Sequence, residues 1–330
     1  MMPIPMPWQL ALTIGENDLE EDFKVRSPSG QVLCTIGLTA TLYIEHGDTP
    51  EVREGMLRAY EQCLRWAGRP FTWGADPTTG DPLSVAQTGV GDVRAWPPAT
   101  LQYFDFQMLF TGAADVDDAD GYSFLAVSRE REEDELSYLS MSLPLEWATR
   151  HSPGEYISIV QELCALVGPA HGYAGPAIIG HAAGNDDEAT AAIFSLARSY
   201  RGLDVDFPPQ HAPYLATEGH IKGINWLTIL GSTLEAQLGG YQTLSETLSP
   251  MARLLAFSSA STGRSGSIVQ VGDRPLAGAV KTKEPMHGYE AVARHLLPIR
   301  TVNPAVIWPQ DAPGFDFDES AAWMRRFDVP

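Results

Sequence analysis

The chain has 330 residues, of which 44% are hydrophobic, so it can bury a substantial core in one large domain or two of ordinary size. It contains 42 acidic and 22 basic residues, a formal net charge of −20. Because such a chain repels nucleic acids and anionic membranes, we expect neither direct nucleic-acid binding nor membrane association. The charge favours a basic protein surface as the partner, although many acidic proteins have no such partner.

The cysteines and the N-terminus both indicate a cytoplasmic protein. Cys34, Cys63 and Cys164 lie in apolar segments and form no C-x-x-C pair, which is typical of reduced thiols in a reducing compartment. The first residues lack a basic region, and prolines interrupt their apolar part, so they do not resemble a signal peptide. No apolar run reaches the length of a membrane span.

The first predicted elements are strands and one helix. A short strand is expected at Leu10–Ile14. Val32–Glu45 alternates between apolar and polar residues and predicts a strand with one buried face. Thr49-Pro50 then opens a helix that ends near Gly68, since proline is favoured at the first helical position.

Loops and a group of strands are predicted next. The Gly- and Pro-rich segment from Phe71 to Thr100 predicts loops with short strand pieces. Three strands follow at Tyr103–Thr111, Tyr122–Arg129 and Leu136–Leu143. Short connections between them favour antiparallel pairing.

The two connections between these strands are acidic and are the best candidates for a partner-binding surface. The first contains Asp115, Asp117, Asp118 and Asp120, and the second contains Glu130, Glu132, Glu133, Asp134 and Glu135. Runs of like charge are usually solvated loops, but a negative surface can also steer association with a basic partner. Binding energy concentrates in buried aromatic residues, so Trp73, Trp96 and Trp308 are candidate anchors, with the edge of the core as their alternative location.

Helix and strand signals alternate in the middle of the chain. Ser152 and Glu155 form a capping box that starts a helix ending near Gly168. Gly172–Gly180 predicts a strand. The acidic run from Asn185 starts a helix that continues through Tyr200, as the helix dipole prefers.

The most apolar segment predicts a central helix at Trp226–Leu238. Leu227, Leu230 and Leu234 recur at three- and four-residue steps, and Gly239-Gly240 is a natural C-terminal stop. A second apolar flank on the same helix places it inside the core.

The last elements complete an α+β pattern. Strands are expected at Arg253–Ala260 and Ser267–Val271, a helix at Gly288–Leu297, and a short helix near Ser320–Arg326 in a tail with four prolines. Strands mixed with helices without strict alternation predict a mainly antiparallel sheet, or sheets, packed with about five helices. A weak similarity between two strand–helix units also allows two similar α/β layers.

Several segments of the chain resemble the type VI secretion immunity family. They are Gly202-Leu203-Asp204-Val205-Asp206, Ile221–Gly231, Leu238-Gly239-Gly240, Gly266–Gly272, Pro275–Gly278 and Tyr289–Arg300. The resemblance is strongest from Tyr200 to Arg300 and extends loosely back to Val32. The predicted organisation is therefore an N-terminal segment (1–31), an α+β domain (32–300) with a subdivision near 200–220, and a Pro-rich tail (301–330).

The resemblance implies an inhibitor and not an enzyme. It implies an antidote that binds a cognate effector toxin, a nuclease of the restriction-endonuclease type with a basic cleft, and blocks that cleft without a cofactor. Neither a monomer nor an oligomer is predicted.

No complete catalytic or metal-binding motif occurs in the sequence. There is no H-E-x-x-H, no zinc-ligand spacing, and Gly263–Gly266 matches the nucleophile elbow only in part. His171 and His181 flank a predicted strand and read as ordinary loop histidines. We therefore predict no catalytic, cofactor-binding or metal-binding residue. An antidote to a toxin that is not a nuclease, and a hydrolase assembled from distant loops, stay open as alternatives.

Overall fold

The computed structural model describes residues 24–96, 106–129, 136–205, 207–209, 211–212, 219–248, 250–301 and 316–328. Its strands are β1 (Lys24–Arg26), β2 (Val32–Ile44), β3 (Trp73–Ala75), β4 (Pro82–Ser84), β5 (Phe106–Thr111), β6 (Ser123–Ser128), β7 (Ser137–Pro144), β8 (His171–Ile179), β9 (Asp204–Val205), β10 (Leu227–Gly231), β11 (Ala252–Ser258) and β12 (Ser265–Val271). Its helices are α1 (Pro50–Ala67), α2 (Val85–Thr88), α4 (Trp147–Arg150), α5 (Pro153–Val167), α6 (Asp187–Ser199), α8 (Ser232–Gln237), α9 (Gly240–Leu248), α10 (His287–His295) and α11 (Phe317–Met324), with 3₁₀ turns η2 (Val93–Ala95) and η3 (Leu297–Ile299).

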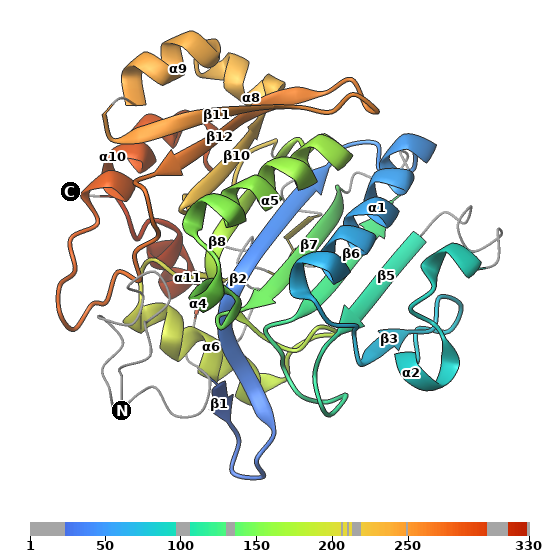
Figure 1. Ribbon diagram of the computed structural model, residues 1–330. Helices are drawn as coiled ribbons and strands as arrows, with labels where there is room; N and C mark the ends of the chain where they lie inside the picture. Colours follow the sequence, from blue (N-terminus) through green and yellow to red (C-terminus); the bar gives the residue numbers. More distant parts are fainter. Residues whose placement is uncertain are drawn as a thin grey trace.

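All twelve described strands belong to one sheet (Figure 1). The order is β11-β12-β10-β8-β2-β7-β6-β5-β3-β4, with β1 beside β2 and β9 beside β8. Among the pairs of named strands only β8 and β9 run parallel. The predicted α+β fold with a mainly antiparallel sheet is therefore confirmed, and strands from before and after residues 206–220 share that sheet. The strand expected at Leu10–Ile14 lies outside the described residues.

The β2 strand is more central than its sequence pattern predicts. It lies between β8 and β7, and all thirteen of its residues are buried. Leu38, Ala40 and Leu42 form one row of side chains, and Thr39 and Thr41 lie on the opposite face. The prediction of a single buried face was wrong. Threonine is common on exposed strand faces, but its small side chain can equally be buried beneath a neighbouring loop and helix.

The helix predicted at Trp226–Leu238 was also wrong in its first half. Leu227–Gly231 is strand β10, which pairs with β12 on one side and β8 on the other, and only Ser232–Gln237 is helical. A strand buried on both faces is apolar at every position, so its leucines can also match a helical spacing by coincidence. The glycine stop is correct, since Gly239 and Gly240 have φ angles of +89° and +83°.

The two longest helices, α1 and α5, lie side by side over one face of the sheet (Figure 1). The ring of Tyr60 on α1 lies 4.7 Å from that of Phe110 and 5.5 Å from that of Phe124, measured between centroids. The Tyr156 hydroxyl on α5 donates to the Thr39 carbonyl. The predicted capping box of α5 is present. The face of β2, β7, β6 and β5 that α1 and α5 cover is apolar and forms the main core of the protein.

The segments that resemble the immunity family are largely buried and structural. The Lys222 ammonium lies 3.1 Å from an Asp204 carboxylate oxygen and donates to the Val205 carbonyl at 2.7 Å, with both charged side chains almost fully buried. The Arg326 guanidinium, which follows α11, donates to the Ile224 carbonyl and the Asn225 side chain. These bonds connect the 202–206 and 221–231 segments to each other and to the C-terminal helix.

Candidate partner interface

The acidic loop between β5 and β6 contains two kinds of carboxylate. Asp115 and Asp117 are exposed, and the Asp115 side chain accepts only the nearby Asp117 N–H. Asp118 accepts the Val32 N–H at 2.8 Å and so holds the loop against the start of β2. Asp120 accepts the Tyr122 N–H at 2.6 Å, and burial raises the pKa of its carboxyl. The first pair therefore faces solvent, and the second pair builds the loop.

Two of the three tryptophans proposed as anchors, Trp73 and Trp96, lie in or near the core. The Trp96 side chain is only 7% exposed, and its indole N–H donates to the Val90 carbonyl at 2.9 Å. Its ring packs against Phe106 and Phe110. Trp73, on β3, is partly buried. In this structure neither ring projects from the surface as an anchor would.

The remaining predicted contacts lie outside the described residues. They are Trp308 and the second acidic run, Glu130, Glu132, Glu133, Asp134 and Glu135.

The loop between β8 and α6 lies against the loop between β5 and β6. The His181 Nε2 is 2.8 Å from the Val116 carbonyl oxygen, a contact that requires Nε2–H to donate. The His181 N–H in turn donates to the Asn185 side chain at 2.8 Å. Gly180 permits this tight turn, because a Cβ there would lie 2.1 Å from the Asn185 side-chain oxygen. One hydrogen bond therefore joins two loops that are far apart in the sequence.

The two loops and the first turn of α6 together form what we call the acidic edge. It comprises Asp115, Asp117, Asp186, Asp187 and Glu188, all of which are exposed. Asp117, His181 and Asp186 line one shallow hollow, which shows that the loops adjoin. The sequence analysis interpreted the acids at 186–188 only as a helix start. Their density was a visible signal, but their position beside Asp117 depends on the fold.

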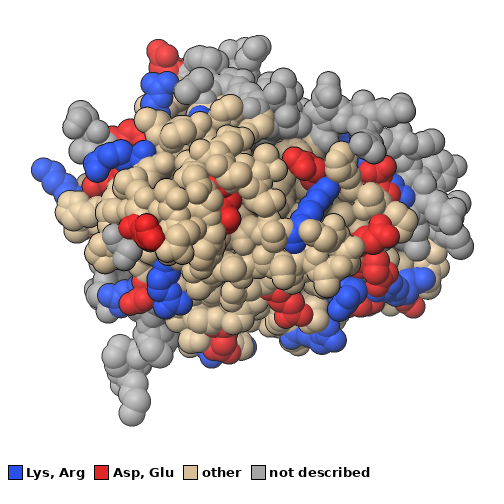
Figure 2. All heavy atoms as spheres, turned by 90° about the horizontal axis from the view of Figure 1, so that it is seen from above, with Lys and Arg blue, Asp and Glu red and all other residues tan. Residues whose placement is uncertain are grey.

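The acidic edge and the helices α8 and α9 lie at opposite ends of the molecule. The acidic edge lies at the end of the sheet marked by α6 in Figure 1, whereas α8, α9 and the β11–β12 turn lie at the opposite end. Figure 2 views that opposite end, and its middle shows few charged side chains.

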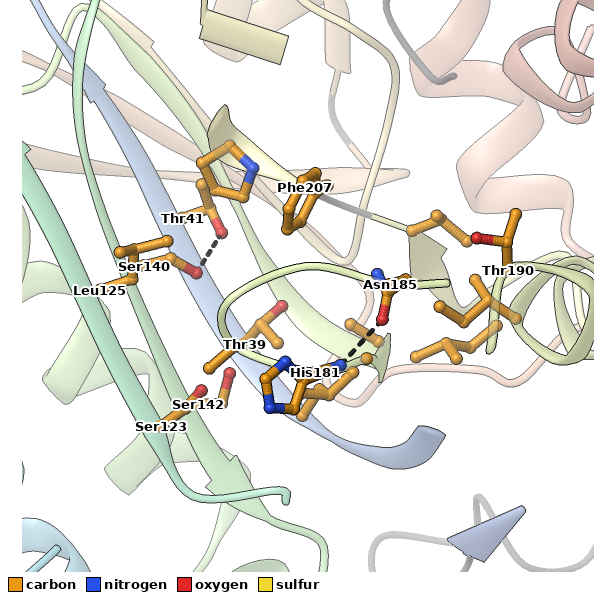
Figure 3. Close-up of a pocket in the computed structure, with 18 of the residues that line it drawn as sticks. Thr39, Thr41, Ser123, Leu125, Ser140, Ser142, His181, Asn185, Thr190 and Phe207 are labelled. Carbon is orange, nitrogen blue, oxygen red and sulfur yellow. Dashed lines mark hydrogen bonds between the residues drawn. The ribbon is translucent and has the colours of Figure 1, made fainter. Parts of the chain in front are cut away.

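A groove adjoins the acidic edge on the sheet face opposite α1 and α5. Its floor is a row of hydroxyl side chains in register, Thr39 on β2, Ser142 on β7 and Ser123 on β6. His181 and Phe207 lie over this floor (Figure 3). The cavity at its base has a volume of about 70 Å³.

The histidines and the partial nucleophile-elbow motif considered in the sequence analysis do not form a catalytic site. His171 is buried and stacks on Tyr43 at 4.9 Å, and both His181 ring nitrogens contact backbone groups. Ser265 follows a turn between two antiparallel strands, not the strand-to-helix turn of a nucleophile elbow.

The thiols and acids likewise form no reactive or metal-binding cluster in the part of the chain that the structure describes. Burial raises the pKa of the Cys34 thiol to about 12 and also raises those of Cys63 and Cys164. Such thiols stay protonated and unreactive at neutral pH. No group of three His, Cys, Asp or Glu side chains in these ranges could hold a metal ion.

Comparison with known proteins identifies the class of the chain. A family model described as "Type VI immunity for VRR-NUC" matches residues 56–327. Since the match covers most of the sequence, the chain belongs to this type VI immunity family. The resemblance seen in the sequence is thereby confirmed.

A solved structure has the same fold. It is the T6SS protein PA0821 of Pseudomonas aeruginosa, with a TM-score of 0.79 over 93% of this chain and 88% of that one. The two sequences are 21% identical, so this likeness concerns the fold alone. A comparison with curated proteins gives no match. No helix within the described ranges has the length and apolar character needed to cross a membrane.

Proposed function

We propose that this protein binds a cognate VRR-NUC effector, covers the nucleic-acid cleft of that nuclease with its acidic edge, and does no chemistry of its own. The family description supports the immunity role and the class of effector. The observation that supports the mode of binding is the acidic edge, where two loops joined by the His181–Val116 hydrogen bond and the adjacent first turn of α6 present five exposed carboxylates.

The physical argument is electrostatic complementarity. A nuclease must present positive charge to the phosphates it binds, and a net charge of −20 attracts such a surface from a distance. Facing charges of opposite sign mainly raise the rate of association and set the orientation. Because Asp118 and His181 already hold the two loops in place, little conformational freedom is lost when the effector binds.

The test is inhibition of the co-expressed, purified effector in a DNA-cleavage assay, together with association rates at low salt. The triple variant Asp115→Asn/Asp117→Asn/Asp187→Asn should associate about tenfold more slowly. A control with the same change in net charge is Glu162→Gln/Glu246→Gln/Asp273→Asn, whose exposed acids lie on other elements. The control should keep most of the wild-type rate.

Two results would count against the proposal. Equal rates for both triple variants would show that the acidic edge is not the interface. A bound effector that does not cleave nucleic acid would overturn the nuclease assignment and favour another kind of toxin.

A further inference from the structure

The floor of the groove contains hydroxyl groups that the protein itself does not use. Thr39 is 9% exposed and Ser142 is 3% exposed, yet neither side chain, nor that of Ser123, hydrogen-bonds to the described residues. In the next row Thr41 and Ser140 bond each other at 2.9 Å. The oxygens of these hydroxyls open into the groove, where water or a ligand can bond them. The row at Thr39 is therefore available to an occupant.

The walls define what this occupant must look like. Leu125, which lies beside Ser140 in the sheet, and Phe207, which lies over the floor, supply apolar surface next to the hydroxyls (Figure 3). Among the described residues that line the groove none is Asp, Glu, Lys or Arg. The site therefore matches a side chain with an apolar stem and a hydrogen-bonding tip, and its small base leaves room for the end of one side chain.

The position of the groove favours a positively charged tip. His181 lines both the groove and the hollow that contains Asp117 and Asp186, so the groove opens beside the acidic edge. A segment that reaches the floor must pass these carboxylates, which attract cations and repel anions. The Phe207 ring offers a further favourable contact to a flat cation.

We propose that the groove receives an arginine side chain from the DNA-binding surface of the effector, a proposal that rests on the proposed function. The guanidinium would donate to the hydroxyl oxygens of Thr39 and Ser142, which face each other on neighbouring strands, and its methylene stem would lie against Leu125 and Phe207. Arginine fits better than lysine, because guanidinium is more weakly hydrated and has several donors in a fixed plane.

The first test uses a small probe and needs no effector. N-acetyl-arginine methylamide is titrated into the full chain, with the neutral citrulline analogue as its matched control, and backbone amide shifts are followed by NMR. We expect saturable shifts at residues 39, 142 and 181, with citrulline binding at least about tenfold more weakly. Ser123→Leu, which fills the groove, should abolish the shifts. Equal binding of citrulline, or no saturable binding of the arginine probe, overturns the proposal.

The second test uses the effector. Thr39→Val/Ser142→Ala removes two hydroxyls with little change in volume, and Ser258→Ala removes an exposed strand hydroxyl elsewhere. The double variant should weaken inhibition by about tenfold, and Ser258→Ala should not change it. Urea unfolding of each variant checks that the fold is intact. If the wild type and the double variant inhibit equally, the groove proposal fails and the immunity function stands. If the wild type does not inhibit, the function fails, and the probe titration still decides the groove.

Discussion

The two faces of the β2–β7–β6 region are built from the same strands but differ in chemistry. Met141 and Ser142 are neighbours in β7, yet Met141 faces the α1–α5 layer and Ser142 faces the groove. The apolar face is filled by large side chains, including Phe124 and Phe110, that are fully buried. The hydroxyl face has small side chains and an open cavity. The difference indicates that the apolar face supplies stability, whereas the hydroxyl face leaves a groove open.

The largest predicted effect tests this division at adjacent residues. Met141→Ala should lower the free energy of unfolding by about 2–5 kcal/mol, because it leaves a cavity in the close-packed core. Ser142→Ala should change it by less than about 1 kcal/mol, since no hydrogen bond to a described residue is lost. Urea unfolding curves of the two variants give both numbers. Similar losses for both would show that the hydroxyl face contributes to stability as much as the apolar face.

The next prediction compares two threonines on the hydroxyl face, Thr41 and Thr39. Thr41→Val should cost about 1–1.5 kcal/mol, because the hydrogen bond between the Thr41 and Ser140 hydroxyls is lost. Thr39→Val, two residues away on the same face, should be close to neutral by the same measurement. A large loss at Thr39 would mean that its hydroxyl is already satisfied, for example by an ordered water, and would weaken the case for a free row.

The smallest effect concerns the helices that cover the apolar face. Ser152 accepts the Glu155 N–H in a complete capping box, whereas Thr49 makes no capping hydrogen bond at the start of α1. Ser152→Ala should therefore destabilise the protein by about 1 kcal/mol and Thr49→Ala by clearly less. Thermal unfolding of both variants compares them directly. Equal losses would indicate that Thr49 caps α1 in solution.

The predictions from sequence were correct where the signal was local and wrong where an element's position in the sheet decided its structure. The helix start at Ser152 was recognisable because its signal is local: a capping residue, a proline and a glutamate within four residues. The strand at Leu227–Gly231 was not, since a strand between β8 and β12 loses the alternation that marks strands. The role of Trp96 was equally hidden, because its burial depends on how the next strand, β5, packs Phe106 and Phe110 against its ring.

The candidate site divides in the same way. The exposure of Asp115 and Asp117 follows from a run of acids in a short loop, and the sequence alone named them. The sequence could not show that Asp118 and Asp120 have a structural role instead. That role follows from their hydrogen bonds to the Val32 and Tyr122 N–H groups, which only the structure shows.

The sequence by itself determined the acidic character of the chain, its strongly signalled helices and strands, and its resemblance to the immunity family, because composition, caps and alternation are local properties. Only the tertiary structure decided that Asp186 lies beside Asp117, that Asp204 pairs with Lys222, and that three hydroxyls on three strands share one groove. Those contacts join residues far apart in the chain, and strand order and register, which no local signal encodes, bring them together.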